Sequence, residues 1–246
     1  MGFWAESMRA IKEADAVLLV LDSRMPELSR NKDLEEKLKK SNKNFFLVFN
    51  KIDLISKETL EKIKKSNKEA FFVSTTTKEG IPKLRTSLLI LAKKLNVKLE
   101  IGMVGYPNVG KSALTNILSR GNKTKVSSKA GTTTGIQWAS SNQFKIVDSP
   151  GVIPYEDDEI KLGILGAKNP EKIKNLESVS LKIIQIFLEN NKTKLEEHFN
   201  FKISSEDEYE ILLEIGHAKN LLKKGGTVDE QRTSLMIIRD WQKGKL

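Results

Sequence analysis

Short apolar runs alternate with amphipathic segments over the first two-thirds of the chain. The runs are Ala16–Leu21, Phe45–Phe49, Ala70–Val73, Leu99–Val104 and Phe144–Val147. Near-continuous apolar runs of this length are typical of strands buried on both faces of a parallel sheet. Over residues 81–95, apolar side chains recur at steps of three and four, which predicts a helix. The alternation predicts an α/β fold with a mostly parallel sheet, whose ligands bind at the carboxyl ends of the strands.

From about residue 167 the pattern becomes helical throughout. Residues 176–190 form a strongly apolar helical stretch. Two further helices open with capping boxes, Ser205 to Glu208 and Thr227 to Glu230, and we expect the first of them to close at Lys223–Lys224 before two glycines. The sequence therefore predicts an α/β domain over residues 1–166 and a small all-helical domain over residues 167–246.

Composition and charge narrow the classes of function. The chain has 246 residues, of which 39% are hydrophobic and 30% charged, as in an ordinary globular protein. The absence of cysteine excludes disulfides and cysteine metal sites. No apolar run is long enough to span a membrane, so we expect a cytoplasmic protein without stable membrane association. The net charge of +10 lies almost entirely in residues 1–167 and indicates a polyanionic partner, with solvated lysine-rich faces as the alternative.

The segment "GYPNVGKS", Gly105 to Ser112, fits the phosphate-loop pattern G-x-x-x-x-G-K-[ST] between a predicted strand and a helix. Its glycines let backbone N–H groups surround an anion at a helix N-terminus. We expect Asn108, Val109, Gly110, Lys111, Ser112 and Ala113 to bind phosphate groups. Lys111 would reach the β- and γ-phosphates, and Ser112 would ligate Mg²⁺.

The segment "NKID" fits N-K-x-D and follows a buried strand. A carboxylate at Asp53 accepts two hydrogen bonds from guanine, from the ring N–H and the exocyclic amine, and adenine cannot supply them. We expect Asn50, Lys51 and Asp53 to recognise guanine. Ser74 and Thr75, after the next strand, would contact the base through their backbone.

A third segment completes the predicted site. Asp148 to Gly151 fits D-x-x-G after a strand, where Asp148 would hold Mg²⁺ through water and the Gly151 N–H would meet the γ-phosphate. The threonine-rich "KAGTTTGIQW" lies between this segment and the phosphate loop, and Thr133 is the candidate that coordinates Mg²⁺. Lys111, Thr133 and Gly151 are the candidate catalytic residues.

The base-recognition segment precedes the phosphate loop, which reverses the order found in most nucleotide switches. Each segment follows a parallel strand, so all of them can gather at one sheet edge in any chain order. A circular permutation preserves those contacts when the original termini lie close together. We therefore interpret the segments as one site in a P-loop NTPase with permuted motif order.

This order, with "LDSRMPELSRNK" near the start and "GGTVDEQRTSLMIIRD" near the end, resembles the circularly permuted GTPases of the YlqF/RbgA type. The resemblance covers nearly the whole chain. It implies a GTP-hydrolysing switch that acts on a large ribosomal subunit precursor, with a helical C-terminal domain that contacts ribosomal RNA. It also implies Mg²⁺, and it admits K⁺ held partly by Asn108.

The chain departs from related patterns in two places. Val152 stands where many small GTPases carry a glutamine that orients water, and residues 1–15 lack the histidine that similar bacterial members carry. The group that orients the attacking water is therefore unassigned, and we expect slow turnover without a partner. Two alternatives stay open: a GTPase with another RNA or membrane target, and an RNA-binding protein that a nucleotide merely stabilises.

Overall fold

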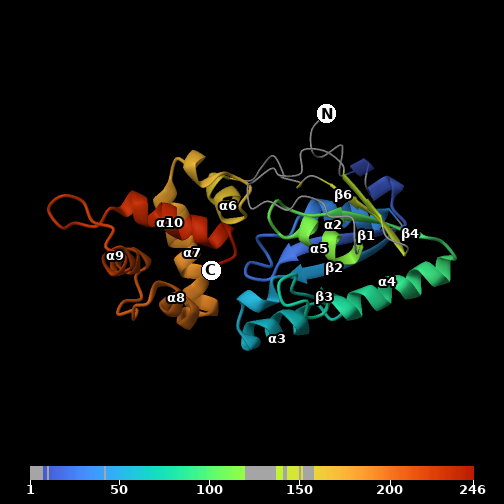
Figure 1. The fold of residues 1–246 in the computed structure, drawn as a ribbon, viewed down its shortest axis with the longest axis horizontal. Helices are drawn as coiled ribbons and strands as arrows, with labels where there is room; N and C mark the ends of the chain where they lie inside the picture. Colours follow the sequence, from blue (N-terminus) through green and yellow to red (C-terminus); the bar gives the residue numbers. More distant parts are fainter. Residues whose placement is uncertain are drawn as a thin grey trace. The chain divides into compact units, whose positions relative to one another are not determined.

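The computed structural model describes residues 8–9, 11–41, 43–119, 137–140, 143–149, 151 and 158–246. The chain divides into two compact units, Met1–Tyr155 and Glu156–Leu246. The first contains the sheet and the second is built from helices (Figure 1). Among the described residues, no helix is both long enough and apolar enough to pass through a membrane.

The first unit is built on a six-stranded sheet with the strand order β3-β2-β1-β4-β6-β5. All neighbouring strands run parallel except β5, which pairs antiparallel with β6. The strands are β1 (Ala16–Asp22), β2 (Asn44–Asn50), β3 (Phe71–Phe72), β4 (Leu99–Val104), β5 (Gln137–Ser140) and β6 (Phe144–Asp148). The predicted α/β class and mostly parallel sheet are confirmed.

Strand β1 lies at the centre of this unit's core, and every one of its residues is buried. Side chains alternate across a strand, so Val17, Leu19 and Leu21 share one face. There they join a buried apolar cluster with residues of helices α2 (Lys32–Lys40) and α3 (Lys57–Ser66). The remaining described elements of the unit are η1 (Ile52–Leu54), α4 (Ile81–Leu95) and α5 (Lys111–Ser119).

All five predicted strands and the helix over residues 81–95 are present in the structure. The sequence pattern does not predict β5, because its four residues, QWAS, form too short a run to show a periodicity. Its antiparallel pairing with β6 places it at the outer edge of the sheet. An edge strand needs only one neighbour and less apolar sequence than a central strand.

The second unit is a helical bundle whose core includes a buried tryptophan. Its elements are α6 (Glu159–Ile164), η2 (Pro170–Lys172), α7 (Leu176–Asn190), α8 (Lys192–Phe199), α9 (Glu208–Ala218) and α10 (Glu230–Gln242). Trp241 is fully buried, donates from Nε1 to the carbonyl oxygen of Ile164 at 2.7 Å, and meets the Phe187 ring edge-on at 5.6 Å. These contacts join α6 to α7 and α10 within the compact unit Glu156–Leu246.

The predicted limits of the helix α9 are wrong at both ends. It begins after Asp207, not Ser205, because the Asp207 carboxylate accepts hydrogen bonds from two backbone N–H groups, those of Tyr209 and Glu210. It ends at Ala218, well before the predicted lysines.

The chain between α9 and α10 forms a tight turn instead of a longer helix. Leu222 pairs antiparallel with Val228, and the N–H of Lys223 donates to the carbonyl oxygen of Thr227 at 2.8 Å. Since Thr227 serves that turn, Asp229 becomes the N-cap of α10, and its carboxylate accepts from the Arg232 N–H at 3.2 Å. The predicted start of α10 at Thr227 is therefore wrong by two residues.

Candidate nucleotide-binding site

The predicted segments converge at the carboxyl edge of the sheet. Strands β1, β2, β4 and β6 are parallel, so their carboxyl ends meet at this edge (Figure 1). The base loop, defined as Asn50–Asp53, leaves β2, and the phosphate loop, Gly105–Ser112, leaves β4. Asp148 is the last residue of β6. Because these strands are neighbours in the sheet, the predicted segments lie at one edge even though they occur in permuted order along the chain.

The phosphate loop adopts backbone conformations that favour glycine. Gly105 has φ +142° and Gly110 has φ +103°. A Cβ atom at Gly105 would lie 2.4 Å from the carbonyl oxygen of Val20, and one at Gly110 would lie 2.1 Å from Nδ2 of Asn50. Both separations are far below van der Waals contact, so the neighbouring strands leave no space for a side chain at either position.

The end of the phosphate loop leads directly into helix α5, which begins at Lys111. The N–H groups of a helix's first turn have no partner inside the helix and lie at its positive end. Ser112 and Ala113 belong to this turn, while Val109 just before it is 1% exposed. Asn108 adopts a left-handed φ of +58°, which asparagine tolerates. This arrangement is suited to binding a phosphate group.

The Lys111 side chain lies back along the phosphate loop. Its Nζ donates to the carbonyl oxygens of Gly105 at 3.1 Å and Tyr106 at 2.7 Å. Burial lowers the pKa of Lys111 to about 8, although the nearby Asp148 carboxylate acts in the opposite direction. The two carbonyl oxygens accept hydrogen bonds from the Lys111 ammonium group but do not neutralise its positive charge. An anion beside the loop would therefore be stabilised.

The Asn50 side chain joins three segments of the site. Its Nδ2 donates to the carbonyl oxygen of Val109 at 2.8 Å and to Oγ1 of Thr75 at 3.5 Å. Its Oδ1 accepts from the Thr75 N–H at 3.2 Å. The N-K-x-D pattern predicts that Asn50 recognises guanine, whereas the contacts of its amide in the structure hold the surrounding loops together.

The other predicted base-binding residues lie around this junction. Asp53 is exposed on η1, directly after Asn50 and Lys51. Ser74 is fully buried, and its Oγ accepts from the N–H groups of Thr76 at 3.2 Å and Thr77 at 2.9 Å. These bonds shape the turn after β3 that carries Thr75. The structure thus brings both predicted base-contacting segments to one place.

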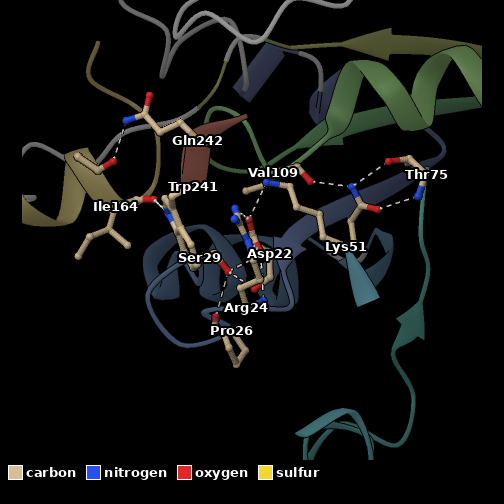
Figure 2. A network of polar contacts seen from close by, with 12 residues as sticks. Asp22, Arg24, Pro26, Ser29, Lys51, Thr75, Val109, Ile164, Trp241 and Gln242 are labelled. Carbon is tan, nitrogen blue, oxygen red and sulfur yellow. Dashed lines mark hydrogen bonds and ion pairs between the residues drawn. The ribbon is translucent and has the colours of Figure 1, made fainter. Parts of the chain in front are cut away.

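Asp22 and Arg24 extend the polar network, and sequence reasoning did not select them as site residues. The Asp22 carboxylate receives the Lys51 Nζ at 2.7 Å and the Arg24 Nη2 at 2.9 Å (Figure 2). Burial would raise the pKa of Asp22, but Arg24 and Lys51 together hold it well below its usual range. The sequence could have indicated Asp22, because it directly follows the apolar run Ala16–Leu21 and therefore lies at the carboxyl end of a predicted strand.

Ser112 and Asp148 fit a magnesium site. Ser112 Oγ donates to Asp148 Oδ2 at 2.6 Å, and the other carboxylate oxygen, Oδ1, is buried with no hydrogen-bond partner among the described residues. Burial raises the pKa of Asp148, against the opposing effects of Lys111 and Ser112. An unpaired buried carboxylate oxygen is costly, and hard cations such as Mg²⁺ prefer oxygen ligands. The donor set is therefore suited to Mg²⁺.

Gly151 packs closely against the phosphate loop. A Cβ atom at this position would lie 2.5 Å from both the backbone N and the Cγ of Pro107. The D-x-x-G segment and the phosphate loop are therefore in contact through backbone that admits no side chain. Thr133 and Val152, the other residues considered for hydrolysis, lie outside the residues that the structure describes.

A phosphate loop and a base loop joined at the edge of a mostly parallel sheet, in permuted order, define a P-loop GTPase fold. Residues 6–156 match the family model described as RsgA GTPase, and residues 100–214 match the model described as 50S ribosome-binding GTPase. The chain belongs to the circularly permuted GTPases of the YlqF/RbgA type.

Three similar proteins support this assignment. A GTP-binding protein of Methanocaldococcus jannaschii is 39% identical over 97% of this chain and 64% of its own length. Ribosome biogenesis GTPase A of Bacillus cereus is 28% identical over all of this chain and 90% of its own length. A GDP-bound YlqF structure is 25% identical, covers 97% of this chain and 94% of its own, and has a TM-score of 0.59. The chain thus spans just under two thirds of the first relative.

Proposed function

We propose that this chain binds GTP and GDP with Mg²⁺, hydrolyses GTP, and acts as a switch in assembly of the large ribosomal subunit. The observation that carries the proposal is the Asn50 side chain, which ties the base loop to the phosphate loop. One guanine nucleotide can therefore occupy both loops at once.

The described residues supply the parts that phosphoryl transfer to water requires. Lys111 and the first turn of α5 would bind the β- and γ-phosphates, and Ser112 and Asp148 would hold Mg²⁺. Bound Mg²⁺ supplies charge neutralisation at the phosphates. The Gly151 N–H would bind the γ-phosphate, and Thr133 would coordinate Mg²⁺ when the γ-phosphate is present. Positioning and electrostatics carry most of such catalysis, so turnover would be slow until a partner or K⁺, held partly by Asn108, completes the site.

The proposed target rests on the relatives and on charge. Names printed for relatives refer to ribosome biogenesis, and a matched family model refers to binding the 50S subunit. The net charge of +10 favours binding to ribosomal RNA, although it lies almost entirely in residues 1–167. We assign RNA contact to the helical unit because the resemblance to the YlqF/RbgA type implies it. This function lies in the cytoplasm.

Phosphate release from GTP tests the enzymatic part. We expect slow release that increases when large subunits are added and is faster in K⁺ than in Na⁺. Lys111→Met should abolish it, whereas Lys83→Met, which removes an exposed lysine from α4, should not. No release under any ionic condition would favour the RNA-binding protein without turnover.

Sedimentation tests the target. The purified chain, mixed with cell lysate and a non-hydrolysable GTP analogue, should travel with large-subunit particles and dissociate from them in GDP. Migration with small subunits or with membranes would favour the alternative GTPase.

Base recognition has a separate test. Asp53→Asn exchanges an acceptor for a donor, so it should disfavour GDP and favour xanthosine diphosphate, whose ring carries a carbonyl in place of the guanine amine. We expect the preference to change by at least about a hundredfold. An unchanged preference for GDP would show that Asp53 does not contact the base.

A further inference from the structure

We propose that Asp22, supported by Arg24, is a positioning residue for guanine selection. In this role the Asp22 carboxylate holds Lys51 in place, so that the turn carrying Asp53 keeps the geometry that accepts guanine. The inference rests on the proposed guanine-nucleotide function and adds a specific role for Asp22, the last residue of β1, and for Arg24 in the loop that follows.

Strand register brings the two charged groups together. Asp22 ends β1 and is paired in register with Asn50, which ends β2. Lys51 is the next residue, and its Nζ donates to Asp22 Oδ2 at 2.7 Å. The Asp22 side chain is 1% exposed and that of Lys51 is 16% exposed. Because water screens this pair poorly, its geometry constrains Lys51 more strongly than an exposed ion pair would.

The backbone of Lys51 needs such a constraint. Its φ of +66° lies in the left-handed region, which is unfavourable for a residue with a side chain. The same residue starts the turn η1, in which the Leu54 N–H donates to the Lys51 carbonyl oxygen at 3.0 Å. Asp53 lies inside this turn and is exposed, so its position follows from the conformation of Lys51. A contact that fixes Lys51 therefore fixes the carboxylate expected to meet guanine.

Asp22 is itself held rigidly by its own loop (Figure 2). Arg24 donates to Asp22 Oδ1 from Nε and from its backbone N–H, both at 3.1 Å, and to Oδ2 from Nη2 at 2.9 Å. The Asp22 N–H donates to Ser29 Oγ at 3.0 Å. The Ser23 N–H donates to the carbonyl oxygen of Asn50 at 2.9 Å. The carboxylate is thus oriented before any nucleotide binds.

The charges around Lys51 provide a measurable signature. Burial lowers the pKa of Lys51 to about 8, and Arg24 lowers it further, while Asp22 and Asp53 raise it. Among the described residues, these three side chains are the charged groups with the largest effects on the pKa of Lys51. Removing the negative charge of Asp22 should therefore lower the pKa of Lys51 further. Any nucleotide affinity that depends on the Lys51 ammonium would then decline at a lower pH.

The test uses Asp22→Asn, which preserves the shape of the side chain and removes its charge. We expect GDP affinity to fall about tenfold or more, as for a lost hydrogen bond between charged groups. The ratio of GDP affinity to inosine diphosphate affinity should also fall, because the base of inosine lacks the exocyclic amine from which the Asp53 carboxylate would accept a hydrogen bond. The pH at which GDP affinity declines should move to a lower value. Calorimetric titration of both nucleotides between pH 6.5 and 9 measures all three.

A matched control and a double-mutant cycle separate positioning from general damage. Glu100→Gln removes a carboxylate that also pairs with a lysine, Lys145, at 2.7 Å, but at the start region of β4, away from the site. It should leave the GDP affinity, the ratio and the pH profile unchanged. In a Lys51→Met background, Asp22→Asn should have little further effect on the ratio, since its influence passes through Lys51.

The outcomes distinguish this inference from the proposed function. If the unmodified chain does not bind GDP, the proposed function fails. If it binds GDP but Asp22→Asn shows the same affinity, ratio and pH profile, the positioning role is overturned and the proposed function stands. The positioning role would also be overturned if Asp22→Asn lowered the ratio of GDP to inosine diphosphate affinity equally in the unmodified chain and in the Lys51→Met variant. Should Asp22→Asn not fold, Arg24→Gln is measured in the same way and is expected to lower the ratio.

Discussion

Nδ2 of Asn50 donates a hydrogen bond of 2.8 Å to the carbonyl oxygen of Val109, a residue 59 positions further along the chain. The bond connects the end of β2 to the phosphate loop after β4, across the central strand β1. It depends on which strands are neighbours and not on the order in which the chain forms them. This explains how a permuted chain retains a single nucleotide site.

Asn50→Ala tests this joint. Removing the amide leaves the buried Val109 carbonyl without its partner, so we expect a loss of about 1–3 kcal/mol in the free energy of unfolding and a drop in GDP affinity of more than tenfold. Urea unfolding and calorimetry measure these quantities. Asn67→Ala is the control, since Asn67 Nδ2 also donates to a backbone carbonyl, that of Ile63 at 2.9 Å, but at the C-terminal end of α3. Equal GDP affinities for the two variants would contradict the role of Asn50.

Gly110→Ala tests the close approach of the two loops. The new Cβ would lie 2.1 Å from Asn50 Nδ2, so the joint must break and GDP affinity should fall more than tenfold. Gly225→Ala isolates backbone strain, because Gly225 has a φ of +100° against +103° for Gly110 but no atom within 4 Å of the added Cβ. It should cost about 1 kcal/mol of stability and leave GDP binding intact. Similar stability losses in both variants would argue against the steric explanation.

Asp148→Asn should stabilise the chain without Mg²⁺ and remove its response to Mg²⁺. The substitution keeps an acceptor for Ser112 but deletes a buried carboxylate whose ionised form burial disfavours, as the raised pKa of Asp148 indicates. In EDTA we expect a gain of about 1 kcal/mol in the free energy of unfolding. GDP affinity should no longer increase when Mg²⁺ is added.

Ser149→Ala is the matched control for this prediction. The Ser149 hydroxyl donates to the Met103 carbonyl oxygen at 2.6 Å, so its loss should lower stability and preserve the Mg²⁺ response. A variant at Asp148 that still binds GDP more tightly in Mg²⁺ would rule out the carboxylate as part of the metal site.

The Asp22 cluster predicts a stability difference that depends on pH. The folded-state pKa of Asp22 lies well below its ordinary value of 3.8. A group of this kind stabilises the fold above the pKa of the unfolded chain and loses that contribution as the pH falls. The difference in unfolding free energy between the unmodified chain and Asp22→Asn should therefore be constant from pH 7 to 5. Below 3.8 it should decline by up to about 1.4 kcal/mol per pH unit.

Urea unfolding of both proteins between pH 7 and 2.5 provides this measurement. Groups that do not interact with Asp22 titrate alike in both proteins and cancel in the difference. A difference that stays constant down to pH 2.5 would mean that Asp22 is not held ionised by Arg24 and Lys51.

Much of the fold follows from local pattern. The apolar runs of β1, β2, β4 and β6 and the helical periodicity of α4 and α7 are visible without coordinates, because burial on two faces or on one stripe leaves a distinct periodicity. The pattern does not predict β5 or the limits of α9, because a four-residue edge strand has little periodicity and because Asp207 competes with Ser205 as a cap.

The sequence by itself determined which residues are predicted to bind a guanine nucleotide, because phosphate, base and metal recognition each require particular side chains beside a strand end. Only the tertiary structure decided how these residues work together. Asn50 joins loops, Asp22 and Arg24 hold Lys51, and Gly151 packs against Pro107. These relationships depend on which strands lie side by side and on their register, and contacts between residues far apart in the chain leave no local periodicity in the sequence.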